Sequence, residues 1–122
     1  MTNYNWSLFI QTIRDKVAAF PNFIYVKRNG QCFNVRRNAR SNCIIGDCLI
    51  GHGLVAIGLD QALWDYERLG SDNDITAIDK EFNLWIPSNV LEWARTLQRE
   101  QDYGQSWSIA LQIADNTVPG IV

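Results

Sequence analysis

The stretch FIYVKRNGQCFNVR, residues 23–36, carries the strongest local signal for a fold in this sequence. It consists of two short runs containing aromatic and β-branched residues, joined by the dipeptide Asn29-Gly30. Asn-Gly readily supplies the positive φ angles of a type I′ turn, which is the common connection in a two-residue β-hairpin. We therefore predict an antiparallel hairpin with strands over 23–28 and 31–36.

The turn also predicts the register of this hairpin, and with it the direction of each side chain. Residues that pair across an antiparallel hairpin share a face, and successive residues lie on opposite faces. One face would hold Ile24, Val26, Phe33 and Val35. The other face would hold Phe23, Tyr25, Lys27, Cys32 and Asn34. We expect the first, apolar face to pack on an N-terminal helix.

Helical periodicity is present on both sides of the hairpin. Before it, apolar residues recur at spacings of three and four between Trp6 and Phe20, and Pro21 should end that helix. After it, residues 43–45 are predicted as a short third strand. The helices expected to follow cover 47–57, 60–69, 76–82, 87–102 and 106–115.

Two glycines, Gly51 and Gly53, lie inside the first of these later helices. Glycine in a helix interior costs about 1 kcal/mol relative to alanine. Their presence indicates one of two situations: a neighbour packs closely against the bare backbone, or the helix is marginal.

These elements predict an α+β fold, with an N-terminal helix, a β-hairpin with an optional third short strand, and then four to five short helices. A chain of 122 residues with 47% hydrophobic residues is long enough for one core, so we expect a single domain over 1–122 with a loose tail from about 116. No run reaches the roughly 18 apolar residues of a membrane span, and no secretory signal is recognisable. We expect a cytoplasmic protein that does not associate with membranes, with its three cysteines reduced.

The charge of the chain is small in total but uneven along its length. The net charge is −2, yet the first forty residues carry seven basic residues against one acid. The basic candidates for binding a partner or nucleic acid are Lys27, Arg28, Arg36, Arg37 and Arg40, with Tyr25 as an aromatic side chain on which a base could stack. The alternative is that the acidic remainder neutralises these cations within the fold, or that they protect a strand edge.

A second candidate set consists of Cys32, Cys43, Cys48 and His52. Three thiolates and one imidazole are a permitted ligand set for structural zinc. The alternative is that the thiols are unligated, the histidine is partly solvated and the protein has no cofactor, since free cysteine often acts as a small buried hydrophobe. Cys48 and His52 are also spaced to meet across one helical turn, but no third group that would complete a catalytic site is recognisable.

Several short patterns give the chain a resemblance to a group of proteins. These are CIIGDCL at 43–49, the Gly-Leu pairs at 53–54 and 58–59, and QDYGQSWSIA at 101–110. The chain resembles, over about 20–115, small proteins of actinobacteria and their phages that have no assigned activity. The resemblance implies a bacterial or phage-infected cytoplasm and an accessory role, and it transfers no catalytic residue.

The sequence favours a binding protein over an enzyme, because it contains no recognisable catalytic set. Our leading hypothesis is a small protein-interaction module, for example a phage-encoded modulator of a host protein. Five tryptophans support this hypothesis, since Trp64 and Trp85 lie where one of them could be exposed. The alternatives are nucleic-acid binding through the basic hairpin region and a small zinc-stabilised domain. An enzyme and the oligomeric state both stay open.

Overall fold

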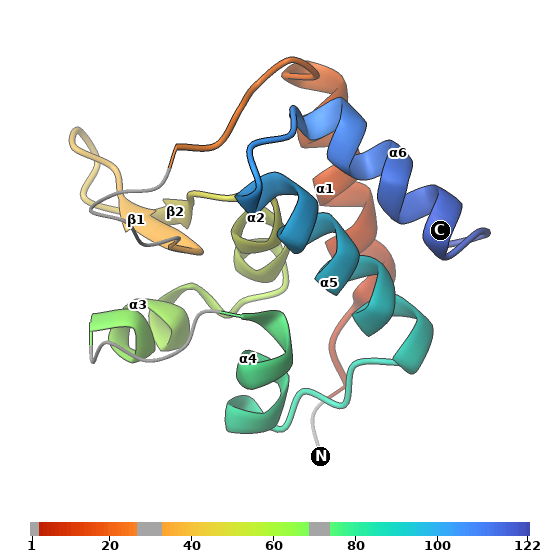
Figure 1. Ribbon diagram of the computed structural model, residues 1–122. Helices are drawn as coiled ribbons and strands as arrows, with labels where there is room; N and C mark the ends of the chain where they lie inside the picture. The colour runs from red at the N-terminus through yellow and green to blue at the C-terminus, as the bar shows by residue number, and fades with distance from the viewer. Residues whose placement is uncertain (1–2, 27–32, 69–73) are drawn as a thin grey trace.

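The structure of the protein is a computed structural model that describes residues 3–26, 33–68 and 74–122. Figure 1 shows a group of packed helices with a small hairpin on one side. The elements are, in chain order, α1 (Trp6–Ala19), β1 (Val35–Arg37), β2 (Ile44–Gly46), α2 (Leu49–Ala56), α3 (Asp60–Arg68), α4 (Ile75–Phe82), α5 (Ser88–Asp102) and α6 (Trp107–Thr117). The predicted α+β class is confirmed, with an N-terminal helix, a two-stranded antiparallel hairpin and then five helices in the described part of the chain. None of these helices is long and apolar enough to cross a membrane.

The hairpin is formed by other residues than the sequence predicted. β1 pairs with β2 in the register Val35 with Gly46, Arg36 with Ile45 and Arg37 with Ile44. The segment predicted as a short third strand, 43–45, therefore pairs with the end of the predicted second strand, 31–36. The turn at Asn29-Gly30, on which the prediction rested, lies outside the described residues.

The described part of the predicted first strand lies outside the sheet, and Ile24, Tyr25 and Val26 have the opposite exposure to the one predicted. Ile24 forms an isolated bridge with Ser106, whereas Val35 pairs with β2. Val26 is 74% exposed and Tyr25 only 7% exposed, so the predicted faces are wrong at these positions. The physical reason is that the large ring of Tyr25 buries more apolar area than a valine, while its hydroxyl finds hydrogen-bond partners inside the protein.

Helix α1 has the apolar stripe that its periodicity predicted. Its N-cap is Asn5, whose side chain accepts the N–H of Leu8 at 3.0 Å. The buried residues of the helix are Phe9, Ile10, Ile13 and Val17. The helix ends at Ala19, shortly before Pro21, as expected for a chain that proline prevents from continuing as a helix.

Helix α2 occupies the centre of the fold, where it contacts α1, α3, α5 and both strands (Figure 1). A Cβ atom on Gly51 would overlap the carbonyl oxygen of Asn34, and one on Gly53 would lie 2.6 Å from the ring of Phe9. The glycines therefore mark close packing, which is the first of the two situations that the sequence left open. Without side chains at these two positions, the strand end and α1 can both approach the helix backbone.

Two buried glutamines on α5 hold the beginnings of three other helices. The amide oxygen of Gln98 accepts the N–H of Ile75, the first residue of α4, at 2.9 Å. The amide oxygen of Gln101 accepts the N–H of Leu49 at the start of α2, at 2.9 Å, and the indole N–H of Trp107 at the start of α6, at 3.1 Å. Because the first N–H groups of a helix have no partner within it, these contacts fix where α2 and α4 begin.

The end of the chain is attached to α1. Arg14 donates to both carboxylate oxygens of Asp115 at 2.9 Å and to the carbonyl oxygen of Ile121 at 2.7 Å. The indole N–H of Trp93 donates to the same carboxylate at 2.9 Å. The hydrogen bond from Arg14 lowers the pKa of Asp115. Ile121 is buried, so the segment after α6 packs back on the body of the protein.

We expect Gly51→Ala to destabilise the protein more than Gly53→Ala. The oxygen of Asn34 cannot retreat, because it belongs to the main chain and accepts the N–H of Asp47 at 2.8 Å, whereas the ring of Phe9 can turn. The free energy of unfolding, measured by urea denaturation, should fall by about 3 kcal/mol in Gly51→Ala, the upper end of the usual range for overpacking. An equal or smaller loss than in Gly53→Ala would contradict this packing.

Candidate functional site

A cavity of about 620 Å³ opens between α1, α2, the hairpin and the start of α6. Its apolar walls come from Phe20, Phe23, Ile45, Val55, Ala56 and Trp107. Its polar side chains are those of Thr12, Lys16, Arg36, Asp47 and His52. A mostly apolar cavity of this size with a few converging polar groups is typical of small-ligand sites, which span about 300–1,000 Å³.

His52 projects from α2 into this cavity. Its ring meets the ring of Trp107 edge-on, with the centroids 6.0 Å apart. The hairpin comes close to the helix here, since a Cβ atom on Gly46 would lie 2.6 Å from Nδ1 of His52. Burial and the positive charge of Lys16 lower the pKa of His52 to about 4. The imidazole is therefore neutral at pH 7, with one nitrogen to donate a hydrogen bond and one to accept.

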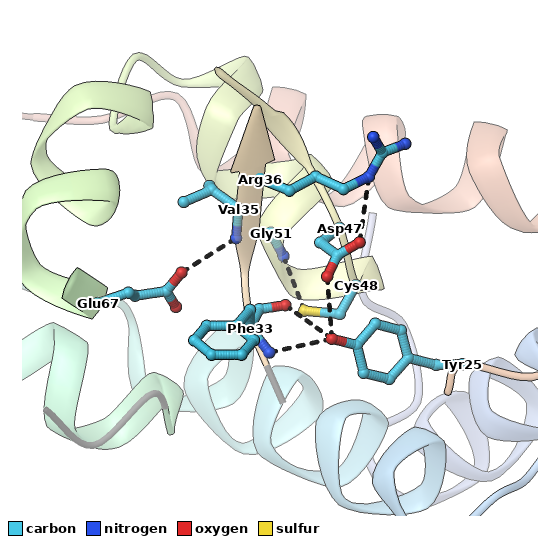
Figure 2. A network of polar contacts seen from close by, with 8 residues as sticks. All are labelled: Tyr25, Phe33, Val35, Arg36, Asp47, Cys48, Gly51 and Glu67. Carbon is cyan, nitrogen blue, oxygen red and sulfur yellow. Dashed lines mark hydrogen bonds and ion pairs between the residues drawn. The ribbon is translucent and has the colours of Figure 1, made fainter. Parts of the chain in front are cut away.

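Asp47 joins the hairpin to the segment that follows α1, as Figure 2 shows. Its carboxylate lies 3.2 Å from Nε of Arg36 and 3.1 Å from the hydroxyl oxygen of Tyr25. That hydroxyl also accepts the N–H of Phe33 at 3.0 Å and lies 3.1 Å from the Phe33 carbonyl oxygen. A hydroxyl has one proton, so it donates to one of these two acceptors at a time. Burial raises the pKa of Tyr25. The carboxylate of Asp47 forms an ion pair with Arg36 in the wall of the cavity.

Lys16 differs from the other cation of the cavity. It lies in the last turn of α1, with its ammonium nitrogen 6.0 Å from the centre of the Phe20 ring. In the ranges that the structure describes, Lys16 forms no ion pair, whereas Arg36 is paired with Asp47. Its ammonium group therefore contributes a positive charge to the cavity that no carboxylate balances directly.

A buried polar network lies beside this cavity and holds β1 in place. The carboxylate of Glu67 accepts the backbone N–H and the side-chain amide of Asn34 at 2.9 and 3.0 Å, and the N–H of Val35 at 3.1 Å. Figure 2 shows Glu67 reaching from α3 to the strand. Burial raises the pKa of Glu67, although these donors oppose the shift. An unpaired buried N–H group would lower the stability of the protein, so the role of this carboxylate is structural.

Cys48 belongs to the same network and acts as a helix cap. Its sulfur accepts the N–H of Gly51 at 3.4 Å and its thiol lies 3.2 Å from Oδ1 of Asn34. The N-cap of α2 is thus Cys48, and the helix begins later than the predicted range 47–57, because the carboxylate of Asp47 turns to Arg36 instead of capping the helix. Cys48 is 1% exposed, and burial raises the pKa of its thiol. Nucleophilic attack and metal ligation both use the thiolate, which this environment disfavours.

The structure separates the three members of the predicted zinc set that it describes. Cys43 is exposed, Cys48 is buried in the network above and His52 faces the cavity, while Cys32 lies outside the described residues. Among the residues described, no group of three or more His, Cys, Asp or Glu side chains is placed to hold a metal ion. The four-residue set stays a prediction.

The predicted binding set of cations is also divided. Lys27 and Arg28 lie outside the described residues. Arg36 pairs with Asp47, Arg37 lies over the ring of Trp64, and Arg40 is exposed in the β1–β2 loop. Tyr25, which we expected on the outer face of the hairpin, is buried.

Sequence reasoning missed most of the cavity. Lys16, Phe20, Phe23 and Trp107 come from opposite ends of the chain and belong to no recognisable catalytic or binding motif. The only signal was local: Lys16 contributed to the basic N-terminal part, and Phe20 to the stripe of the first helix. Neither indicates which distant residues would meet them.

Comparison of the chain with protein-family models finds no match. A search of curated proteins finds no significant match. A search of solved structures likewise finds none. The resemblance to small actinobacterial and phage proteins stays a prediction. In the structure, the residues that carry it have packing roles: Gln101 joins three helices, and Gly104, with a φ of 95°, follows the end of α5.

We expect the single histidine to titrate with a pKa of about 4, followed by its imidazole proton resonances in NMR. The ordinary value is 6.5, so the unfolded chain takes up the proton first as the pH falls. The contribution of this group to stability is therefore full above about pH 6.5 and is lost towards pH 4. His52→Gln should remove that part of the pH dependence, and a pKa near 6.5 would contradict the burial of the ring.

Glu67→Gln should lower the free energy of unfolding by about 1–3 kcal/mol, because the new amide leaves the buried N–H of Asn34 or that of Val35 without an acceptor. Asp65→Asn, at an exposed position of the same helix, should change it by less than about 0.5 kcal/mol. Since the pKa of Glu67 is raised, the wild-type protein should also lose stability as the pH rises through that pKa, and the glutamine variant should not. Equal stability of both variants in urea denaturation would refute this role.

Proposed function

We propose that this protein binds a small organic acid with an apolar body in the cavity between α1, α2, the hairpin and α6. The observation that carries the proposal is the ammonium group of Lys16, which pairs with no carboxylate in the described part of the chain and lies in the wall of a largely apolar cavity of about 620 Å³. An apolar cavity alone would accept any hydrophobic group. The cation adds a preference for a ligand with a negative charge at one end.

The apolar part of the ligand would lie against the aromatic walls. The rings of Phe23 and Trp107 are 4.5 Å apart and inclined at 50°, which leaves a wall with several ring surfaces. Phe20 is partly exposed at the same cavity, although it lies at the end of an otherwise well-packed helix. A ligand that covered these rings would remove apolar area from water, and that transfer favours binding by roughly 25 cal/mol per Å² of area.

The charged part of the ligand would lie near Lys16. Arg36 supports the positive potential of the wall, but its guanidinium is already held by Asp47. Neutral His52 is within the same cavity and can donate or accept one hydrogen bond without adding a charge. A carboxylate, sulfonate or phosphate headgroup fits this combination of one free cation and one neutral imidazole.

The same groups favour binding over catalysis. A general base works best with a pKa near the working pH, whereas the pKa of His52 is about 4. The thiol of Cys48 is buried and engaged as a helix cap. We therefore assign the cavity a ligand and no reaction.

The test uses two fluorescent probes that differ chiefly in charge, 8-anilinonaphthalene-1-sulfonate and its uncharged analogue N-phenyl-1-naphthylamine. We expect both to bind the folded protein, and Lys16→Met to weaken only the sulfonate, by about tenfold, because one charge-assisted contact is lost. Ala56→Trp, which fills the cavity from α2, should weaken both probes.

The matched control is Lys80→Met, which removes an exposed lysine on α4 outside the cavity and should change neither affinity. Near-ultraviolet circular dichroism checks that each variant keeps its packed aromatic residues. The proposal would be refuted if Ala56→Trp left the affinity for both probes unchanged, or if Lys16→Met weakened both probes equally.

The expectations of a protein partner, of a phage-encoded modulator and of a cytoplasmic location remain proposals. One feature supports a partner: Trp85 is 70% exposed and its backbone has a φ of 57°, in a region that bulky residues rarely adopt. Its neighbours Leu84 and Ile86 are both buried, so this loop presents the indole to solvent from a fixed position. Exposed tryptophans are enriched among residues that dominate protein interfaces.

A further inference from the structure

We infer that Arg37 and Arg68 form a second binding site, for a phosphate group, at the side of the hairpin that faces α3. This site is separate from the cavity of the proposed function, and either assignment can hold without the other. The inference rests on two arginines from different elements whose guanidinium groups both lie over the ring of one tryptophan.

Both guanidinium groups make cation–π contacts with the ring of Trp64. The central carbon of Arg68, one helical turn further along α3, lies 3.7 Å from the ring centroid, and that of Arg37, on β1, lies 4.5 Å from it. Arg68 also lies 5.6 Å from the ring of Phe33. Stacking on an aromatic face orients a guanidinium group and limits its motion, so both arginines are positioned before any ligand arrives.

No carboxylate within the described ranges forms an ion pair with Arg37 or Arg68. Among the described residues, each of the two uses one donor in a hydrogen bond: Arg37 donates to the carbonyl oxygen of Asn42 and Arg68 to that of Trp64. A guanidinium group has five N–H donors, so most donors of both groups remain available. The carboxylate of Glu67 interacts electrostatically with Arg68, but it is buried and accepts the N–H groups of Asn34 and Val35.

The space between these groups suits a small anion. A cavity of about 270 Å³ is lined by Phe33, Val35, Arg36, Arg37, Trp64 and Arg68. Two cations beside one ring repel each other, and a dianion or phosphodiester between them would remove that repulsion. Arginine forks match the oxygen atoms of phosphate, and aromatic residues beside them are typical of sites for single-stranded nucleic acid.

The chemistry fits two sources of phosphate, inorganic phosphate and the backbone of single-stranded nucleic acid. The experiment titrates the folded protein with sodium phosphate, and separately with a strand of ten thymidines, while NMR follows the arginine Nε–H and tryptophan indole resonances. We expect phosphate to shift Arg37, Arg68 and Trp64. Binding of the strand, with an affinity that falls with salt at a log–log slope of about −1.4 for two contacts, would identify the backbone as the source. Binding of inorganic phosphate alone would identify the free anion.

Variants separate this site from general attraction to a basic surface. The double variant Arg37→Gln, Arg68→Gln should weaken phosphate binding at least tenfold, and the double lysine variant should weaken it in part, because lysine keeps the charge but loses the planar fork. Arg95→Gln, at an exposed arginine on α5, is the matched control and should have no effect. Equal shifts at Arg95 and Arg37, unchanged affinity in the double glutamine variant, or the same shifts with chloride at equal ionic strength would overturn the inference.

Discussion

The contact between the main chain of Asn34 and the bare backbone of Gly51 is the constraint on which the rest of the structure depends. It brings the beginning of β1 directly against the central helix, at a distance that any side chain at position 51 would prevent. The side chain of Asn34 then connects two buried groups, the carboxylate of Glu67 on α3 and the thiol of Cys48 at the start of α2. Its carbonyl oxygen accepts the N–H of Asp47. One residue thus joins the hairpin to two helices.

This arrangement places the two candidate sites on either side of the hairpin. Successive residues of a strand point in opposite directions, so Arg36 turns to Asp47 at the large cavity while Arg37 turns to Trp64 on α3. Among the residues that the structure describes, Arg36 pairs with a carboxylate and Arg37 does not. The free charge of the large cavity comes instead from α1, through Lys16. The ligand chemistry proposed for both sites follows from the cations that have no carboxylate partner among the described residues.

Several residues of types that are common in catalytic or binding sites have structural roles in this protein. Cys48 caps a helix, Glu67 accepts the N–H groups of a strand end, and Gln101 joins three helices. Each satisfies a buried polar group that would otherwise be costly. In the predicted zinc set, Cys48 and His52 are four residues apart. In the structure, this is the spacing between the N-cap of α2 and a residue one turn later that lines the cavity. A residue pattern alone cannot distinguish these cases, because both use the same side chains at the same helical positions.

The sequence by itself determined the helices. Periodicity and helix-end signals are local, so the stripe of α1, the end of that helix before Pro21 and the start of α6 near residue 106 could all be predicted from neighbouring residues. The glycines of α2 also indicated a close neighbour, without identifying it. Only the tertiary structure decided which segments pair in the sheet, because the energy of Tyr25 depends on acceptors at Phe33 and Asp47 rather than on its own strand propensity. The same holds for both candidate sites, whose residues meet through contacts between distant segments that no local pattern encodes.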